Sequence, residues 1–133
     1  MKVVVPFCAA DADQAINLLE FIGQVGGCEH YDCLLVLDAA VDWSKSIEAM
    51  HHANAAFRSA AIVTTAAPVV GWPQGANALW MEASMYCHGK GTDWLWLEPD
   101  AIPIKRGWLT SIDKVRRGSR YFGAIYPDQG QAC

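Results

Sequence analysis

The chain has 133 residues, of which 53% are hydrophobic and 18% are charged. This length favours one domain over residues 1–133 with a single core, and the composition excludes a disordered chain. The formal net charge of −4 gives the molecule as a whole no preference for polyanions.

Strand-like and helix-like segments alternate along the chain. Apolar and β-branched runs predict strands over residues 1–5, 33–37, 60–65, 94–97 and 121–126. Pro6 is expected to end the first strand. Helices are predicted from Asp11 to the glycine pair 26–27, from the cap Asp42 onward, from the loop at 67–75 to the break at 88–91, and over 108–117.

Each of the first three helices carries apolar residues at helical spacing, most of which we expect to face the core. In the first helix these are Ala15, Leu18, Leu19, Ile22 and Val25; in the second Trp43, Ile47, Met50 and Phe57; in the third Ala76, Leu79, Trp80, Ala83 and the pair 86–87.

The alternation predicts an α/β fold, with a mainly parallel sheet and helices on both of its faces. Such sheets bind ligands at the carboxyl ends of their strands. Acidic residues follow three of the predicted strands, and we expect them to gather along one edge: Asp11, Asp38, Glu98 and Asp100.

The five cysteines are odd in number and irregularly spaced, which is typical of free thiols in a reducing compartment. The segment Cys28-x-His30-x-x-Cys33 resembles half of a zinc site, but no second pair follows at a familiar spacing. The start of the chain does not have the pattern of a signal peptide, and no apolar run approaches the roughly 20 residues of a membrane span. We therefore expect a cytoplasmic protein.

The last acidic pair follows an unusually apolar strand, Trp-Leu-Trp-Leu at 94–97. Pro99 stiffens the backbone between Glu98 and Asp100, so the two carboxylates can converge where the chain turns. Two nearby anions favour a cation between them, and Mg²⁺ or Mn²⁺ prefers such oxygen ligands. The alternative is that both acids cap the next helix or face water, because acid-x-acid triplets are common by chance.

The segments GWPQGANALWMEAS and DWLWLEPDAIPIKRGWL resemble glycosyltransferases of GT-A fold, especially short phage-type members. That family uses an Asp-x-Asp motif after a buried strand, for which Glu98-Pro99-Asp100 stands here. Residues 102–109 resemble its P-x-x-x-G-W continuation, and residues 4–7 are similar to its first strand. The resemblance covers residues 1–126 and is most specific over 71–109.

The resemblance implies a metal-dependent transfer of a sugar from a nucleotide-diphosphate donor, such as a UDP- or GDP-sugar, with Mn²⁺ or Mg²⁺ as cofactor. Asp100 would ligate the metal directly, and Glu98 would reach it through water or hold the ribose or the sugar. The implied nucleotide- and sugar-binding residues are Pro6, Phe7, Asp11, Asp38, Trp72, Gly75, Asn77, Lys105 and Arg106. For Trp72 and Asn77, loop packing and an ordinary place in the first helical turn are the alternatives.

Two departures from the family leave other functions open. The first acid of the motif is Glu, and no His follows His88 to act as a late metal ligand. The chain is also short for the family, so we expect a minimal or truncated GT-A architecture. The alternatives are a non-catalytic nucleotide-sugar-binding or assembly module, and a nucleotidyltransferase. The latter normally has a glycine-rich, basic loop after its first strand, which PFCAADADQ lacks.

Partners are suggested by two surface features. Six of the ten basic residues lie between Lys105 and Arg120, which is compatible with a solvated helix face or with a phosphate-facing role. With the phage-type resemblance, this makes DNA a candidate acceptor. The high apolar content predicts a homodimer through exposed residues such as Trp80, Met81 and Met85 or the 122–126 segment.

Overall fold

The computed structural model describes residues 1–68, 71 and 73–116. Its sheet has four strands in the order β3-β2-β1-β4, and every pair is parallel. The strands are β1 (Lys2–Phe7), β2 (Asp32–Leu37), β3 (Ser59–Thr64) and β4 (Trp94–Trp96). The predicted parallel sheet is therefore confirmed for its first four strands, and the expected strand at 121–126 lies outside the described residues.

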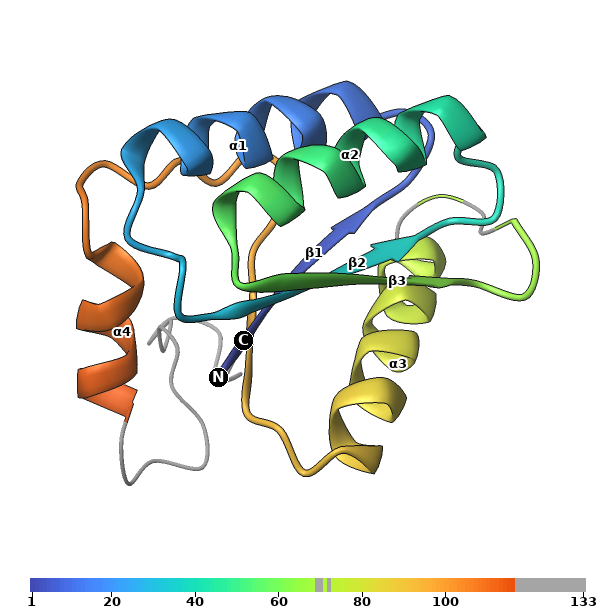
Figure 1. Cartoon of the computed structure of the whole chain (residues 1–133). Helices are drawn as coiled ribbons and strands as arrows, with labels where there is room; N and C mark the ends of the chain where they lie inside the picture. The colour runs from blue at the N-terminus through green and yellow to red at the C-terminus, as the bar shows by residue number, and fades with distance from the viewer. Residues whose placement is uncertain (69–70, 72, 117–133) are drawn as a thin grey trace, which may run out of the picture.

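Helices cover both faces of the sheet, as the alternation predicts (Figure 1). The helices α1 (Ala12–Val25) and α2 (Trp43–Ala56) lie on one face, and α3 (Gln74–Gly89) lies on the other. This is a Rossmann-like arrangement. Among the helices of the described ranges, none combines the length and the apolar composition that crossing a membrane requires.

The core is divided by the sheet, because successive side chains of a strand point to opposite faces. On the α1 and α2 side, Val3, Val5 and Phe7 of β1 pack with alternate residues of β2. On the α3 side, Val4 packs with the smaller cluster Leu34, Val36, Leu79, Ala83 and Cys87. Covering on both faces explains why β1 and β2 read as continuous apolar runs rather than as alternating ones.

The buried face of α2 differs in part from the predicted one. The helix begins after Asp42, whose side chain accepts a hydrogen bond from the Ser44 backbone N–H. Trp43 is 74% exposed and Ile47 is 52% exposed. The buried positions are instead Ser46, Ala49, Ala53 and Ala56. Met50 and Phe57 do pack in the core, as predicted. Small side chains let α2 approach both α1 and the sheet closely, and the other two large apolar residues remain outside.

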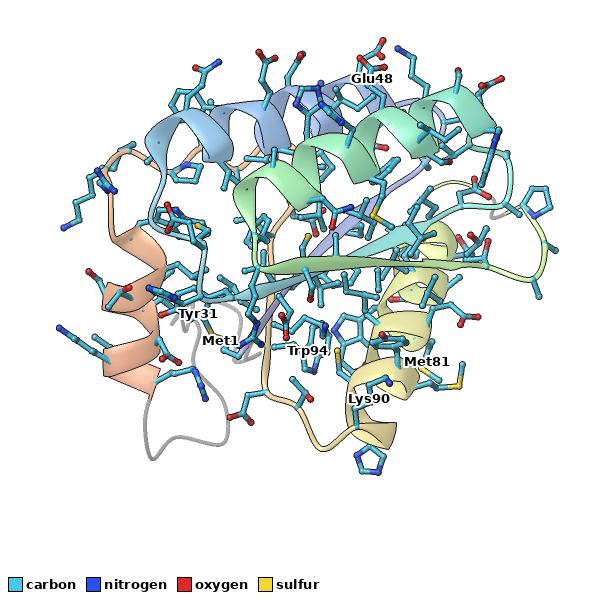
Figure 2. The ribbon with its side chains drawn as sticks, in the orientation of Figure 1. Met1, Tyr31, Glu48, Met81, Lys90 and Trp94 are labelled. Carbon is cyan, nitrogen blue, oxygen red and sulfur yellow. The ribbon has the colours of Figure 1, made fainter. Side chains whose placement is uncertain are left out.

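The helix α4 (Trp108–Arg116) lies beside the connection between α1 and β2 (Figure 1). Trp108 and Leu109 are buried in the larger core cluster. The Tyr31 hydroxyl and the Thr110 hydroxyl are 3.4 Å apart, and Figure 2 shows Tyr31 close to α4. Arg116 donates a hydrogen bond of 2.6 Å to Asp93, just before β4. These contacts fix α4 at the end of the sheet where the strands begin.

Pro6 lies within β1 and not after it, because β1 extends to Phe7 and pairs with β2 over its whole length. The Leu97 N–H bonds the Val4 carbonyl at 2.9 Å, so Val4 and, by alternation, Pro6 direct their backbone groups toward β4. The next rung of this ladder would need an N–H group at Pro6, which proline lacks. Pairing of β4 with β1 accordingly stops at Val4 and Trp96.

Asp32 at the start of β2 connects two neighbouring strands. Its carboxylate accepts hydrogen bonds from Arg58 Nε at 2.9 Å and Nη2 at 2.8 Å, and from the Ser59 hydroxyl at 2.8 Å. Chiefly because of the Arg58 bond, the pKa of Asp32 falls from 3.8 to about 2.

We expect Asp32→Asn to lower the free energy of unfolding by about 0.5–1 kcal/mol near neutral pH, because the ion pair is partly exposed. The pKa of Asp32 is lower in the folded chain, so its contribution is complete above about pH 4 and is lost as the pH falls toward about 2. Urea unfolding of both proteins across this range measures the difference. A difference that does not shrink with falling pH would contradict the ion pair.

Candidate functional site

The sheet order places a crevice between β1 and β4. From β1 the chain crosses to β2 through α1 on one face, and it returns from β3 to β4 through α3 on the other face. The connections therefore diverge at the carboxyl ends of β1 and β4, which is where ligands of such sheets bind. A cavity of about 610 Å³ lies at this point.

The turn after β4 forms one wall of the cavity. The Ala101 N–H bonds the Glu98 carbonyl at 3.0 Å, which closes a turn with Pro99 and Asp100 at its centre. Pro99 is buried, whereas Glu98 and Asp100 are exposed. All three residues line the cavity. Proline anchors the turn against the protein and leaves both carboxylates accessible.

Trp96 holds the first of these carboxylates. Its indole N–H donates a hydrogen bond to Glu98 Oε1. Trp96 also lines the cavity, and its ring packs edge-on to Trp94 with centroids 6.0 Å apart. Figure 2 shows Trp94 between the sheet and α3. The orientation of Glu98 therefore depends on an aromatic row that is itself packed against the smaller core cluster.

Asp11 and Asp38 reach the same cavity from β1 and β2. Asp11 Oδ1 accepts the Cys8 N–H at 2.6 Å and closes the loop after β1. Asp38 is only 5% exposed, and its Oδ1 accepts the Ala40 N–H at 3.1 Å. The expectation that the acids after the strands gather along one edge is thus confirmed, and two of them also stabilise the loops that carry them.

The charged side chains in the described lining of the cavity are all negative. It contains the four carboxylates of Asp11, Asp38, Glu98 and Asp100, and no Lys, Arg or His within the part of the chain that the structure describes. An anionic ligand would be repelled here unless a cation accompanied it.

The start of α3 forms the opposite wall through Gly71, Gly75, Ala76 and Leu79. Gly71 has a φ of 49°, a conformation that glycine adopts without strain. Its carbonyl accepts the Gly75 N–H at 2.6 Å, which ties the loop to the first turn of α3.

Four other residues predicted for the site differ in whether they reach the cavity. Pro6 and Phe7 line the cavity. Asn77 is exposed on the first turn of α3 and is not part of the cavity lining. Trp72 lies outside the described residues.

The basic residues after the turn lie elsewhere. The Arg106 side chain is close to Gly26 and Gly27 at the end of α1, and Lys105 beside it is exposed. This is the end of the sheet at which the strands begin, opposite to the cavity. The structure therefore does not bring Lys105 or Arg106 to the cavity. Arg116, from the same basic cluster, is paired with Asp93 and Asp113.

The carboxylates of the cavity could supply only part of the ligand set of a metal ion. No group of three or more His, Cys, Asp or Glu side chains that could hold a metal occurs among residues 1–68, 71 and 73–116. Glu98 and Asp100 alone fit a Mg²⁺ or Mn²⁺ ion whose other ligands are phosphate oxygens and water, since such ions are commonly held by one or two carboxylates. The donor set suits a metal that arrives with its ligand.

The cysteine pair does not fit zinc. Cys28 and Cys33 are both buried. Burial raises the pKa of the Cys28 thiol to about 11 and raises that of Cys33 as well. Both side chains belong to the larger core cluster. Within the described residues neither is part of a group of three possible metal ligands, so they act as core residues.

Sequence reasoning missed several residues of the cavity, of which Cys8, Gln14 and Trp96 carry polar or reactive groups. Gln14 could have been found, because it is a polar residue in the first turn of the helix that follows β1. Trp96 comes two residues before Glu98 and hydrogen-bonds it, but the apolar character of the strand gave no indication of this role.

Fold and site together define an α/β protein of Rossmann-like arrangement with an acidic cavity at the point where its strand order reverses. No protein-family model matches the chain, and neither a curated protein nor a solved structure is detectably similar to it.

Proposed function

We propose that this chain is a metal-dependent glycosyltransferase domain of GT-A type that binds a UDP- or GDP-sugar in the cavity between β1 and β4. The observation that carries the proposal is the Glu98-Pro99-Asp100 turn, which presents two accessible carboxylates at the carboxyl end of β4. The cavity volume of about 610 Å³ is also within the usual range for sites that enclose a small organic ligand.

Electrostatics supports a metal in this site. The diphosphate of a nucleotide sugar is an anion, and the only charged side chains in the described lining are carboxylates. A divalent cation between the diphosphate and Asp100 would turn this repulsion into attraction. When bound, the metal would neutralise the charge that develops on the departing nucleoside diphosphate.

The remaining lining residues then have distinct roles. Glu98, oriented by Trp96, would hold a metal-bound water or a sugar hydroxyl. Asp38 and Asp11, at the ends of the neighbouring loops, would accept hydrogen bonds from ribose or base. The backbone at Pro6 and Gly75 would form the walls beside the nucleotide, with the N-terminus of α3 directed at the phosphates.

Two other functions would use the same fold. A non-catalytic nucleotide-sugar-binding module would use the same cavity without releasing nucleotide. A nucleotidyltransferase is disfavoured because Cys8, Ala9 and Ala10 after β1 offer neither glycine nor lysine to a triphosphate. The described part of the basic cluster lies away from the cavity, so it gives no support to DNA as the acceptor.

A thermal-shift screen of nucleotide sugars with Mn²⁺ tests the proposal. We expect one UDP- or GDP-sugar to raise the melting temperature by on the order of 5–10 °C at about 100-fold its dissociation constant, and EDTA to abolish the shift. Alkylation mapped by mass spectrometry should show protection of Cys8, which lines the cavity.

The outcomes separate the candidate functions. Metal-dependent release of free nucleotide from the stabilising donor would support transfer, and stable binding without release would favour the non-catalytic module. A shift that is equally large in EDTA, or no shift with any donor, would contradict the proposed site.

A further inference from the structure

The strand β3 ends the described sheet, and its outer edge is directed away from β2. The Thr65 N–H bonds the Leu37 carbonyl at 2.9 Å, so Thr65 and, by alternation, Val63 and Ala61 face β2. The intervening residues Ala60, Ile62 and Thr64 must direct their backbone groups outward. The Ala60 N–H confirms this, because it bonds Asn54 Oδ1 of α2 at 3.2 Å.

Within the described residues, this edge has neither of the usual protections against pairing. Proteins commonly blunt an edge strand with charged residues or proline. The sequence of β3, Ser-Ala-Ala-Ile-Val-Thr, contains neither. Asn54 satisfies only the first outward N–H group.

An apolar surface of α2 continues this edge. Trp43 and Ile47, which are 74% and 52% exposed, lie one turn apart. With Ser46, Met50 and Ile62 they line a shallow hollow of about 180 Å³ between α2 and β3. None of the five residues is charged.

We propose that this surface, made of the β3 edge and the Trp43–Ile47 stripe of α2, pairs with the same surface of a second copy. The two β3 strands would run antiparallel across a two-fold axis at Ile62, and the two Ile62 residues would exchange their N–H and C=O groups. The Thr64 N–H would face the Ala60 carbonyl of the second copy. The result is a continuous eight-stranded sheet with the two α2 helices packed side by side.

A second copy fits this surface better than a charged partner does. A two-fold contact between uncharged surfaces brings no like charges together, and the residues that line this hollow are uncharged. A 14-residue helix and a six-residue strand are each about 20 Å long. With the Trp43 side chain they offer roughly 500–700 Å² per copy, at the lower limit for a stable interface.

A second exposed apolar surface, on α3, is a weaker candidate for this contact. Met81 and Met85 are 54% and 59% exposed, and Figure 2 shows Met81 directed away from the sheet. Trp80 packs on Trp94 with ring centroids 5.8 Å apart. This surface offers side chains but no strand edge with directed hydrogen-bonding groups, which would fix one register.

Light scattering on the purified chain tests the proposal. We expect twice the 14.5 kDa chain mass at about 100 µM and dissociation in the low micromolar range. Ile47→Lys should make the protein monomeric at every concentration, because two lysines would meet near the axis. Met85→Lys makes the same change on α3 and should leave the dimer intact.

A second pair of variants tests the strand. Thr64→Pro removes an outward N–H and no bond to β2, so the fold should persist while dimerisation weakens by at least about tenfold. Thr64→Val keeps the N–H and should dimerise normally, and circular dichroism verifies the fold of each variant. A monomeric wild-type chain, or a dimer broken by Met85→Lys and not by Ile47→Lys, would overturn the proposal. Donor binding is measured separately and does not depend on this contact, because the cavity lies at the β1–β4 side of the sheet.

Discussion

Replacing Asp100 by Asn is expected to weaken Mn²⁺-dependent nucleotide binding by roughly 10- to 100-fold, the usual effect of losing one charged contact. The loss should be large because the described lining has no basic side chain that could hold the phosphates in place of the metal. Asp100 is exposed at the centre of a turn, where Asn is equally suitable, so the fold should not change. Isothermal titration of UDP and GDP with Mn²⁺ measures the effect.

Glu48→Gln provides the matched control, since Glu48 is an exposed acid on the outer side of α2, as Figure 2 shows. Its removal changes the net charge equally but should leave nucleotide affinity unchanged. If Asp100→Asn binds the metal–nucleotide complex as tightly as the wild type, Asp100 is not a ligand and the proposed site loses its main support.

Ala53→Leu is expected to lower the free energy of unfolding by about 1–3 kcal/mol, the usual cost of overfilling a packed core. Ala53 is fully buried on the alanine face with which α2 contacts α1 and the sheet. Leucine is a good helix former, so any loss reflects packing rather than helix propensity. Urea unfolding at constant ionic strength measures it.

Ala55→Leu tests the same exchange on the exposed side of the same helix. Its effect should stay within about 0.5 kcal/mol. Equal effects of the two variants would mean that α2 does not pack through its alanines, and the orientation of the helix in the fold would then be incorrect.

The sheet could be predicted from the sequence because a strand buried on both faces must be continuously apolar. Residues 3–5 and 33–37 show this pattern and are buried in β1 and β2, and the helix between them requires a parallel connection. The face of α2 could not be predicted by the same rule. Its contact distance requires alanine, so the large apolar residues Trp43 and Ile47 remain on the outer surface.

The candidate site was predictable to the extent that it depends on strand ends. Asp38 and Glu98 each follow a strand, and parallel strands bring such residues together at one edge. The position of Arg106 was predicted wrongly because it depends on the path of residues 101–107. These residues return to the end of the sheet where the strands begin, before α4 starts. An irregular segment of that kind has no periodicity from which a direction could be read.

A sheet of this kind has two structural requirements that often conflict, and Pro6 allows β1 to meet both. The strands must pair over enough length to be stable, yet two of them must part to admit a ligand. β1 meets the first demand by pairing with β2 along all six of its residues. The missing amide hydrogen at Pro6 meets the second, because it ends the pairing with β4 next to the Glu98 turn. The opening of the cavity therefore depends on a backbone hydrogen bond that cannot form. The side chains around the opening can change with the ligand while the opening itself persists.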